Sequence, residues 1–153
     1  SILRGNLSEV SFVAGLEVAT KGVDSAAADE KNDPVAVGKT VAKRLGGVAA
    51  ITGAVDVITD GTRVVKIRNG HPMLSKVTGT GCMTSGLVGA YAGAGKDLFL
   101  AAVGGIASMG IAGEIAFETA GEKGTGSFHI AIIDALSKLD GAGMEQRGKI
   151  DEA

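Results

Sequence analysis

The sequence predicts an α/β fold, and three observations support this class. Short segments with the character of strands, such as 48–52, stand between longer segments with the character of helices, such as 34–45. Gly and Pro residues mark the boundaries between these segments. Hydrophobic residues make up 45% of the 153 residues, enough for the core of one domain or of part of a larger one. Because sheets and helices bury their apolar faces against each other in layers, we expect an α/β sandwich.

The first predicted elements are a strand and two helices, each marked by the residues at its ends. Residues 1–4 have the character of a strand end, and Asn6 is a good cap for a helix that starts at about Leu7. Asp33 and Pro34 mark the second helix, since Asp is a common N-cap and Pro fits the first helical position. The other boundaries are a polar link at 26–32, a helix from 34 to about 45, and a helix end at Gly46-Gly47.

The later segments continue the alternation of strands and helices. Asp60-Gly61 is a typical hairpin turn. The apolar run 98–113 is too short and too rich in Gly to span a bilayer, so we interpret it as part of a buried core helix whose glycines allow close packing. The stretch 121–126 is expected to cap helices, His71 to lie in a loop, and residues 140–153 to form a polar, frayed end. The strands are predicted at 48–52, 56–59 and 63–68, and the helices at 82–92, 98–119 and 128–139.

Composition and charge argue against several classes of protein. The net charge is −2 and no basic face is evident, which argues against nucleic acid as a partner. One Cys cannot form an internal disulfide, and one Cys with two His cannot make the usual zinc sites. The start of the sequence has no features of a signal peptide and nothing indicates a membrane partner, so we expect a cytoplasmic protein.

The most informative stretch is a glycine-rich turn, Gly79-Thr80-Gly81-Cys82, which follows the strand predicted at 63–68 and leads into the helix predicted at 82–92. The first amides of a helix have no acceptor within the helix, and the helix dipole adds positive charge there. Such a turn suits a phosphate or a developing oxyanion, and it favours a thiolate. The alternative is a tight turn with a small buried Cys, which the pattern by itself slightly favours.

Resemblance to a known family changes this balance. The stretch VTGTGCMTSGLVGAYAGAG at 77–95 resembles the anion-hole segment of hydroxyethylthiazole kinases, ribokinase-like enzymes of thiamine biosynthesis. The resemblance covers nearly the whole chain, because four other segments agree in order and spacing. These segments are residues 2–9, 21–25, 51–56 and 126–128.

The resemblance implies a ribokinase-like α/β/α sandwich. Members of the family carry a substantial portion before the segment that matches Ile2–Glu9, and here that segment stands almost first. We therefore expect residues 1–153 to be the C-terminal part of a single kinase domain, with the N-terminal portion missing.

The resemblance also assigns roles to the residues of the glycine-rich turn. Ribokinase-like enzymes usually carry an Asp as general base after the anion hole, and the thiazole kinases resemble this sequence in having Cys there. The resemblance therefore implies that Cys82 is the base, or the group beside the substrate hydroxyl, with Thr80 and Gly81 in the anion hole. Gly79 matches a position that contacts the substrate through its backbone.

Residues near the start of the chain match two further sites of the family. Asn6 and Glu9 form an Asn-x-x-Glu pattern, which is typical of a capping box at a helix start. The same pattern resembles a kinase motif that helps to hold Mg²⁺, often through water, so both roles remain open. Arg4 and Thr52 match positions that contact ATP in the family, although nothing in their local sequence distinguishes them.

The function implied by the resemblance is phosphorylation of the primary alcohol of 4-methyl-5-(2-hydroxyethyl)thiazole, with ATP as co-substrate and Mg²⁺, by a homotrimer in the cytoplasm. One alternative is a related kinase for another small alcohol, such as hydroxymethylpyrimidine or pyridoxal, although Cys82 in place of Asp argues against it. Another is a non-catalytic nucleotide-binding fragment, because the missing portion supplies thiazole contacts in the family. Residues 1–153 alone are then expected to be inactive.

Overall fold

The structure, a computed structural model, describes residues 1–15 and 33–153. Within these residues the strands form one five-stranded sheet, and helices separate several of them in the sequence, so the predicted α/β class is confirmed. The motif at 21–25 and the polar link predicted at 26–32 lie outside the described residues. The strands follow one another across the sheet in the order β1 (Ile2–Asn6), β2 (Val48–Thr52), β3 (Asp56–Thr59), β4 (Val64–Ile67) and β5 (Ile150–Glu152).

The chain divides by its contacts into two compact units. Unit 1 comprises residues 1–66 and 151–153, and unit 2 comprises residues 67–150. That all 153 residues are part of one kinase domain stays a prediction.

The described residues of unit 1 form two helices, α1 (Leu7–Val13) and α3 (Pro34–Leu45), whose ends follow the predicted local chemistry. Asp33 caps α3 by accepting hydrogen bonds from the amides of Val35 and Ala36. Gly46 ends the same helix in the left-handed conformation, at φ 59°. The predicted boundaries of α3 are confirmed. They could be predicted because the residues that set them act on neighbours only a few positions away.

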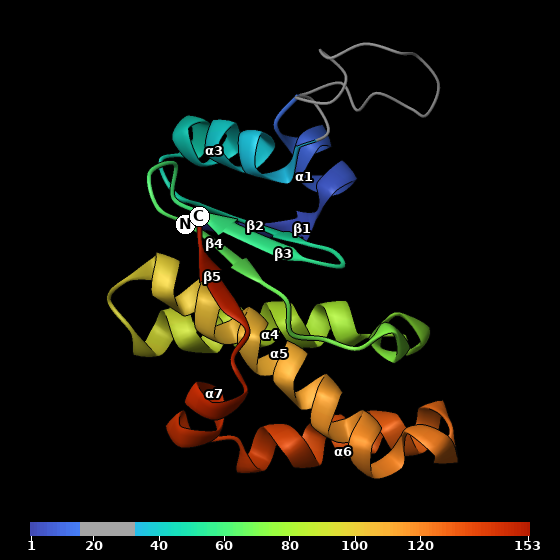
Figure 1. Cartoon of the computed structure of the whole chain (residues 1–153). Helices are drawn as coiled ribbons and strands as arrows, with labels where there is room; N and C mark the ends of the chain where they lie inside the picture. The colour runs from blue at the N-terminus through green and yellow to red at the C-terminus, as the bar shows by residue number, and fades with distance from the viewer. Residues whose placement is uncertain (16–32) are drawn as a thin grey trace. The chain divides into compact units, whose positions relative to one another are not determined.

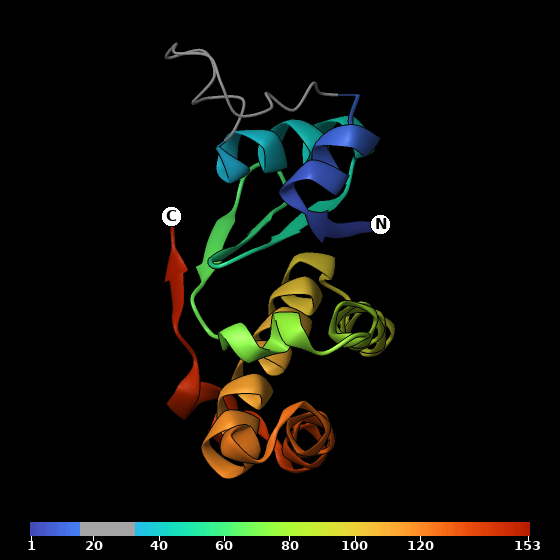
Figure 2. The ribbon, with the colours of Figure 1, turned by 90° about the vertical axis from the view of Figure 1, so that its right-hand side faces the viewer.

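The connections between the strands of unit 1 determine their directions. β1 and β2 run parallel, with α1 and α3 between them in the sequence, whereas the short connection from Thr52 to Asp56 makes β2 and β3 antiparallel. Figures 1 and 2 show α1 and α3 on the same face of these strands. Leu3 and Ile51 pack in the core beneath the two helices. Because side chains alternate along a strand, Arg4 and Thr52 project from the opposite face.

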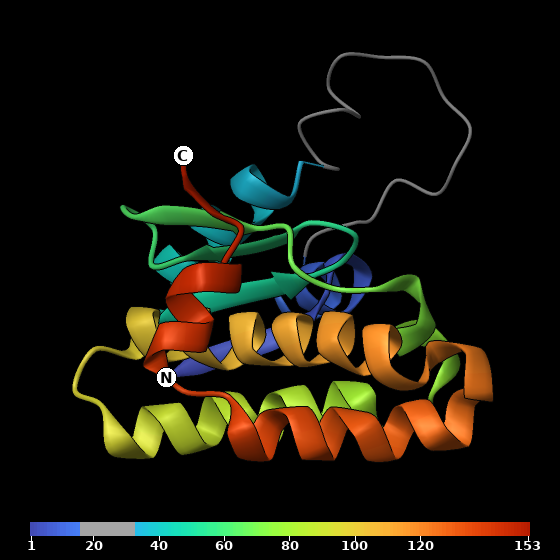
Figure 3. The ribbon, with the colours of Figure 1, turned by 60° about the horizontal axis from the view of Figure 1, so that its bottom comes forward.

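Unit 2 is built around one long apolar helix. Its elements are η1 (Pro72–Lys76), α4 (Thr80–Ala94), α5 (Leu98–Ala120), η2 (Gly121–Lys123), α6 (Thr125–Lys138) and α7 (Gly141–Arg147). α5 packs against both α4 and α6, as Figure 3 shows. Met109, Ala112 and Ala116 of α5 form a core with Phe128 and Ile132 of α6.

The glycines of α5 allow the close packing that the sequence predicts. A Cβ at Gly105 would lie 2.7 Å from the Cα of Val88 in α4, so only Gly fits there. The span Leu98–Lys123 is long and apolar enough to cross a membrane by length and composition, but 67% of its apolar 18-residue window is buried inside the protein. This burial agrees with the interpretation of α5 as a core helix.

The segment between β4 and α4 differs from the prediction. The 3₁₀ helix η1 lies between β4 and α4, and α4 begins at Thr80, two residues before the predicted start. His71, expected to be a loop residue, caps η1 by accepting a hydrogen bond from the amide of Met73 at 3.1 Å. Its ring stacks on Phe117 of α5 at a centroid distance of 3.6 Å. These contacts fix the path of the chain into α4.

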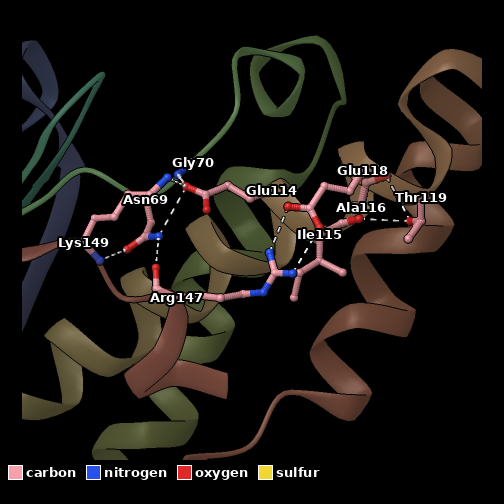
Figure 4. A network of polar contacts seen from close by, with 9 residues as sticks. All are labelled: Asn69, Gly70, Glu114, Ile115, Ala116, Glu118, Thr119, Arg147 and Lys149. Atoms are coloured by element: carbon pink, nitrogen blue, oxygen red, sulfur yellow. Dashed lines mark hydrogen bonds and ion pairs between the residues drawn. The ribbon is translucent and has the colours of Figure 1, made fainter. Parts of the chain in front are cut away.

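The prediction of a frayed end over residues 140–153 is wrong, because α7 and β5 occupy most of it. Asn69, which follows β4 in the sequence, binds the segment at the end of α7 and just after it (Figure 4). Its Nδ2 donates to the carbonyl of Arg147 at 2.9 Å, and its Oδ1 accepts from the amide of Lys149 at 2.7 Å. Asn69 is buried, so its hydrogen bonds are shielded from water and favour an ordered segment.

Two carboxylates of α5 strengthen this attachment. Glu114 accepts hydrogen bonds from the amide of Gly70 at 2.9 Å and from Nζ of Lys149 at 3.0 Å. Glu118 binds the guanidinium of Arg147 through both carboxylate oxygens, at 2.9 and 3.1 Å. Local sequence patterns do not reveal these contacts, since the partners lie 29 to 44 residues apart.

Candidate functional site

Arg4 and Thr52, the two predicted ATP contacts, lie side by side on β1 and β2. The guanidinium Nη2 of Arg4 donates to the hydroxyl of Thr52 at 3.1 Å. The hydroxyl of Thr52 in turn lies 3.3 Å from the carbonyl oxygen of Gly5. The parallel register, in which Arg4 is opposite Ala50 and Asn6 opposite Thr52, accounts for this pairing. The structure thus brings together two residues that are 48 positions apart.

The start of α1 is a complete capping box. Oδ1 of Asn6 accepts from the amide of Glu9 at 2.9 Å, and Oε2 of Glu9 accepts from the amide of Asn6 at 2.7 Å. The capping interpretation is therefore confirmed. Both residues are exposed to solvent, so the remaining carboxylate oxygen of Glu9 can reach water.

The metal role of this pair stays a prediction. Within residues 1–15 and 33–153, no group of three or more His, Cys, Asp or Glu could hold a metal ion. Mg²⁺ does not require such a group, because it usually keeps several waters and binds one or two carboxylates together with substrate phosphates. A single exposed carboxylate at Glu9 fits that kind of binding.

Asp56, at the start of β3, is a polar residue that sequence reasoning did not single out. The antiparallel register pairs Ile51 with Val57. Extended by one position, the same register places Asp56 opposite Thr52. Oδ1 of Asp56 accepts from the amide of Gly53 at 2.9 Å. Burial raises the pKa of Asp56 to about 6, against the opposing effects of the Gly53 hydrogen bond and the Arg4 charge. The hairpin pattern around Gly53 is the signal that could have placed this carboxyl beside Thr52.

The glycine-rich turn forms the N-terminus of α4. Gly79 is the N-cap residue, at φ 98°, and it provides no side-chain cap for the helix. Cys82 is a free, exposed thiol in that turn, so the alternative of a buried structural Cys is wrong. Gly79 suits its position because an L-residue with a side chain rarely adopts this backbone conformation.

Thr80 has a structural task in addition to any role in the anion hole. Its hydroxyl lies 3.0 Å from the carbonyl oxygen of Leu74 and 3.2 Å from that of Val77. These bonds tie the start of α4 to the end of η1. The hydroxyl is therefore engaged with the backbone, and the group that Thr80 can offer to an anion is its amide.

The sequence-predicted residues thus form two groups, one in each unit. Arg4, Asn6, Glu9 and Thr52 belong to β1, α1 and β2 of unit 1, whereas residues 79–82 belong to unit 2. The first group offers a guanidinium, a hydroxyl and an exposed carboxylate. The second offers the positive end of a helix and a thiol. These are the groups that a phosphoryl-transfer reaction uses to hold and neutralise phosphates.

Comparison with known proteins agrees with this chemistry. The model of the hydroxyethylthiazole kinase family matches residues 1–142. A hydroxyethylthiazole kinase from Ruminiclostridium cellulolyticum is 60% identical over 99% of this chain and 56% of its own length. One from Clostridium beijerinckii is 56% identical, again over 99% of this chain and 56% of its own length.

A solved structure with the same fold gives the same match. The structure of a hydroxyethylthiazole kinase protein from Pyrococcus horikoshii has a TM-score of 0.83 and 32% identity, and the match covers 100% of this chain and 55% of the other. The ribokinase-like fold that the resemblance implies is therefore supported over the whole chain. The chain spans about half the length of the curated relatives it matches.

Proposed function

The chain belongs to the hydroxyethylthiazole kinase family, and on that premise we propose that its enzyme transfers the γ-phosphoryl group of ATP to the primary alcohol of 4-methyl-5-(2-hydroxyethyl)thiazole. The observation that carries the proposal is the start of α4, where an N-cap without a side chain and an exposed Cys82 stand together. A related kinase for hydroxymethylpyrimidine or pyridoxal is not favoured, because the relatives at 60% and 56% identity are hydroxyethylthiazole kinases.

Residues of unit 1 would hold the nucleotide. Arg4 supplies a permanent positive charge, and its hydrogen bond to Thr52 orients both side chains for ATP. Glu9, assisted by Asn6, would hold Mg²⁺ through water against the nucleotide phosphates. When bound, the metal neutralises the charge that these phosphates carry.

Residues of the α4 turn would act on the reacting groups. The amides of Thr80, Gly81 and Cys82 would stabilise the charge on the transferring phosphoryl oxygens, as donors that are already oriented before the reaction. Cys82 would accept the proton of the substrate hydroxyl, or hold that hydroxyl while the proton passes to the phosphate. Gly79 would contact the substrate through its backbone.

The setting of the enzyme is part of the same proposal. Residues 1–153 correspond to the C-terminal part of one kinase domain, and the enzyme works as a homotrimer in the cytoplasm on small molecules, without nucleic acid or membrane. The length of the relatives supports the view that the chain corresponds to part of a longer enzyme, since the match covers little more than half of each relative. The low net charge of −2 is consistent with partners that are not nucleic acids.

A substrate panel tests the proposal. The whole enzyme with Mg-ATP is expected to phosphorylate the thiazole alcohol in preference to hydroxymethylpyrimidine and pyridoxal, with product measured by mass spectrometry. Residues 1–153 alone are expected to give no product. Preference for either of the other alcohols would replace the substrate assignment, and failure to phosphorylate any of the three would overturn the kinase proposal.

A further inference from the structure

Three polar side chains share one face of the sheet in unit 1. Leu3 and Ile51 point into the core beneath α1 and α3, so the alternating residues Arg4 and Thr52 point away from it. Residues opposite each other in antiparallel strands project to the same side, which adds Asp56 to this face. A guanidinium, a hydroxyl and a carboxyl therefore stand next to one another on β1, β2 and β3.

Asp56 lies at the end of the connection that follows Thr52, where β3 begins. Its Oδ1 holds the amide of Gly53 at 2.9 Å, which fixes the first residue of the turn. The positive charge of Arg4 acts on the Asp56 carboxyl and favours its ionised form, although burial opposes this. The carboxyl is therefore coupled both to the backbone beside Thr52 and to the side chain of Arg4.

We propose that Asp56 is a positioning residue for ATP, which sets the orientation of the Arg4 guanidinium and of the turn after Thr52. The inference rests on the proposed function, because it assumes that Arg4 and Thr52 contact the nucleotide. Asp56 acts through these two residues and does not itself contact ATP. It keeps the two contact residues in the arrangement that receives the nucleotide before ATP arrives.

A second Asp in the next turn shows what a purely structural role looks like. Asp60 accepts hydrogen bonds from the amides of Thr62 and Arg63 and from Nε of Arg63, at 3.0, 2.8 and 2.7 Å. Among the described residues, these partners belong to its own turn. Asp56 differs because its charge also couples to Arg4, which lies on another strand. Asp60 is therefore a matched control in the same unit.

The test compares Asp56→Asn with Asp60→Asn in the whole enzyme. The amide of Asn can still accept the hydrogen bond from Gly53, so the turn is preserved while the charge toward Arg4 is lost. We expect Asp56→Asn to weaken Mg-ATP binding about tenfold, which corresponds to about 1.4 kcal/mol. The kcat value should stay within about twofold of the wild type. Asp60→Asn should leave both quantities unchanged.

A double-mutant cycle separates positioning from a general structural effect. In the Arg4→Ala background, Asp56→Asn should cause no further loss of Mg-ATP affinity, because the residue through which it acts is gone. Affinity is measured by calorimetry, and folding by circular dichroism. An unchanged affinity in Asp56→Asn, or a loss of the same size with and without Arg4, would overturn the inference.

Calorimetry measures Mg-ATP binding without turnover, so failure of the positioning role of Asp56 can be distinguished from failure of the proposed function. If the wild type binds Mg-ATP but phosphorylates none of the alcohols, the kinase proposal fails while the role of Asp56 can still be measured. If the wild type is an active thiazole kinase and Asp56→Asn binds Mg-ATP normally, the positioning role fails alone.

Discussion

The N-termini of α1 and α4 both carry residues assigned to phosphate chemistry, but they differ in where their backbone amides find acceptors. At α1 the acceptors are built in, since Asn6 and Glu9 bond each other's amides at 2.9 and 2.7 Å. At α4 the N-cap is Gly79, which provides no side-chain cap. Most other described α-helices follow α1, with Asp at the N-cap: Asp33 for α3, Asp97 for α5 and Asp140 for α7.

The difference shows which helix start is available to an anion. A carboxylate or amide oxygen at the N-cap already offsets the positive end of the helix, so an added anion gains little there. Without such a group, the end of the helix can attract a ligand. α6 also begins at a glycine without a side-chain cap, Gly124, but Cys82 is the one cysteine of the chain and lies at α4. An uncapped start is therefore necessary for the proposed site but not sufficient.

Giving α4 a cap like those of its neighbours should have the largest effect. Gly79→Asp would put a carboxylate on the amides of the first turn and in the path of the γ-phosphate. We expect kcat/KM for ATP in the whole enzyme to fall about 10²–10³-fold, as when a donor of an oxyanion hole is lost. Steady-state kinetics with the thiazole alcohol measure the change.

The matched control is Gly124→Asp at the start of α6. Gly124 also has a positive φ, 106°, so both variants strain the backbone. We expect the control to lose stability through this strain and to keep its kinetic constants. Equal kinetic losses in the two variants would mean that strain, and not the added carboxylate, is responsible.

Asp56→Asn should change stability with a clear dependence on pH. The pKa of Asp56 rises from 3.8 to about 6 on folding, mainly through burial. The folded protein therefore holds a proton between these values that the unfolded chain has released, and stability falls as pH rises through this window. Above pH 6 the ionised carboxyl costs up to about 3 kcal/mol, and Asp56→Asn should recover part of this.

Thermal unfolding of the whole enzyme at pH 8 and pH 5 measures the effect. The gain in Tm of Asp56→Asn should be larger at pH 8. Asp60→Asn should show no gain, because burial of the Asp60 carboxyl is outweighed by its hydrogen bonds to Arg63 and Thr62, which hold its pKa below the usual value. A gain of equal size at both pH values would contradict the role of ionisation.

Cys82→Ala tests the thiol at the N-terminus of α4, where Gly79 provides no side-chain cap. A positioned base contributes about 10²–10⁴-fold, and we expect a loss in kcat at the low end of this range or below it, with ATP affinity nearly unchanged. Cys82→Asp should retain activity, because a carboxylate can also accept the proton. Ser85→Ala, at an exposed position in the next turn, is the control. An unchanged kcat in Cys82→Ala, where chemistry limits the rate, would leave only the backbone amides in the mechanism.

Glu9→Gln tests the N-terminus of α1, which is closed by the capping box, and should have the smallest effect. Gln can still accept from the amide of Asn6, so the capping box is retained and stability should change by less than about 1 kcal/mol. Loss of the charge should raise the Mg²⁺ concentration for half-maximal rate by up to about fivefold. A titration of rate against Mg²⁺ measures this. If the Mg²⁺ concentration for half-maximal rate is unchanged and only stability is lost, Glu9 acts as a helix cap and not in metal binding.

Much of the fold could be predicted because its signals are local. Asn6 and Glu9 are three residues apart, and Asp33 caps a helix that starts at the next residue, so helix starts follow from short patterns. Arg4 and Thr52 could be named only through resemblance, since nothing in their local sequence distinguishes them. The end of the chain was predicted wrongly because its order depends on Asn69, which lies 80 positions from Lys149.

By itself, therefore, the sequence determined the class of fold, the ends of most elements and the glycine-rich start of α4, because neighbouring side chains and backbone preferences decide these features. Tertiary structure alone decided three others. It paired Arg4 with Thr52, engaged the hydroxyl of Thr80 with the carbonyl of Leu74, and buried the carboxyl of Asp56 near the Arg4 charge. The physical reason is that hydrogen bonding and desolvation depend on which groups the folded chain brings into contact, and distance along the sequence does not report this.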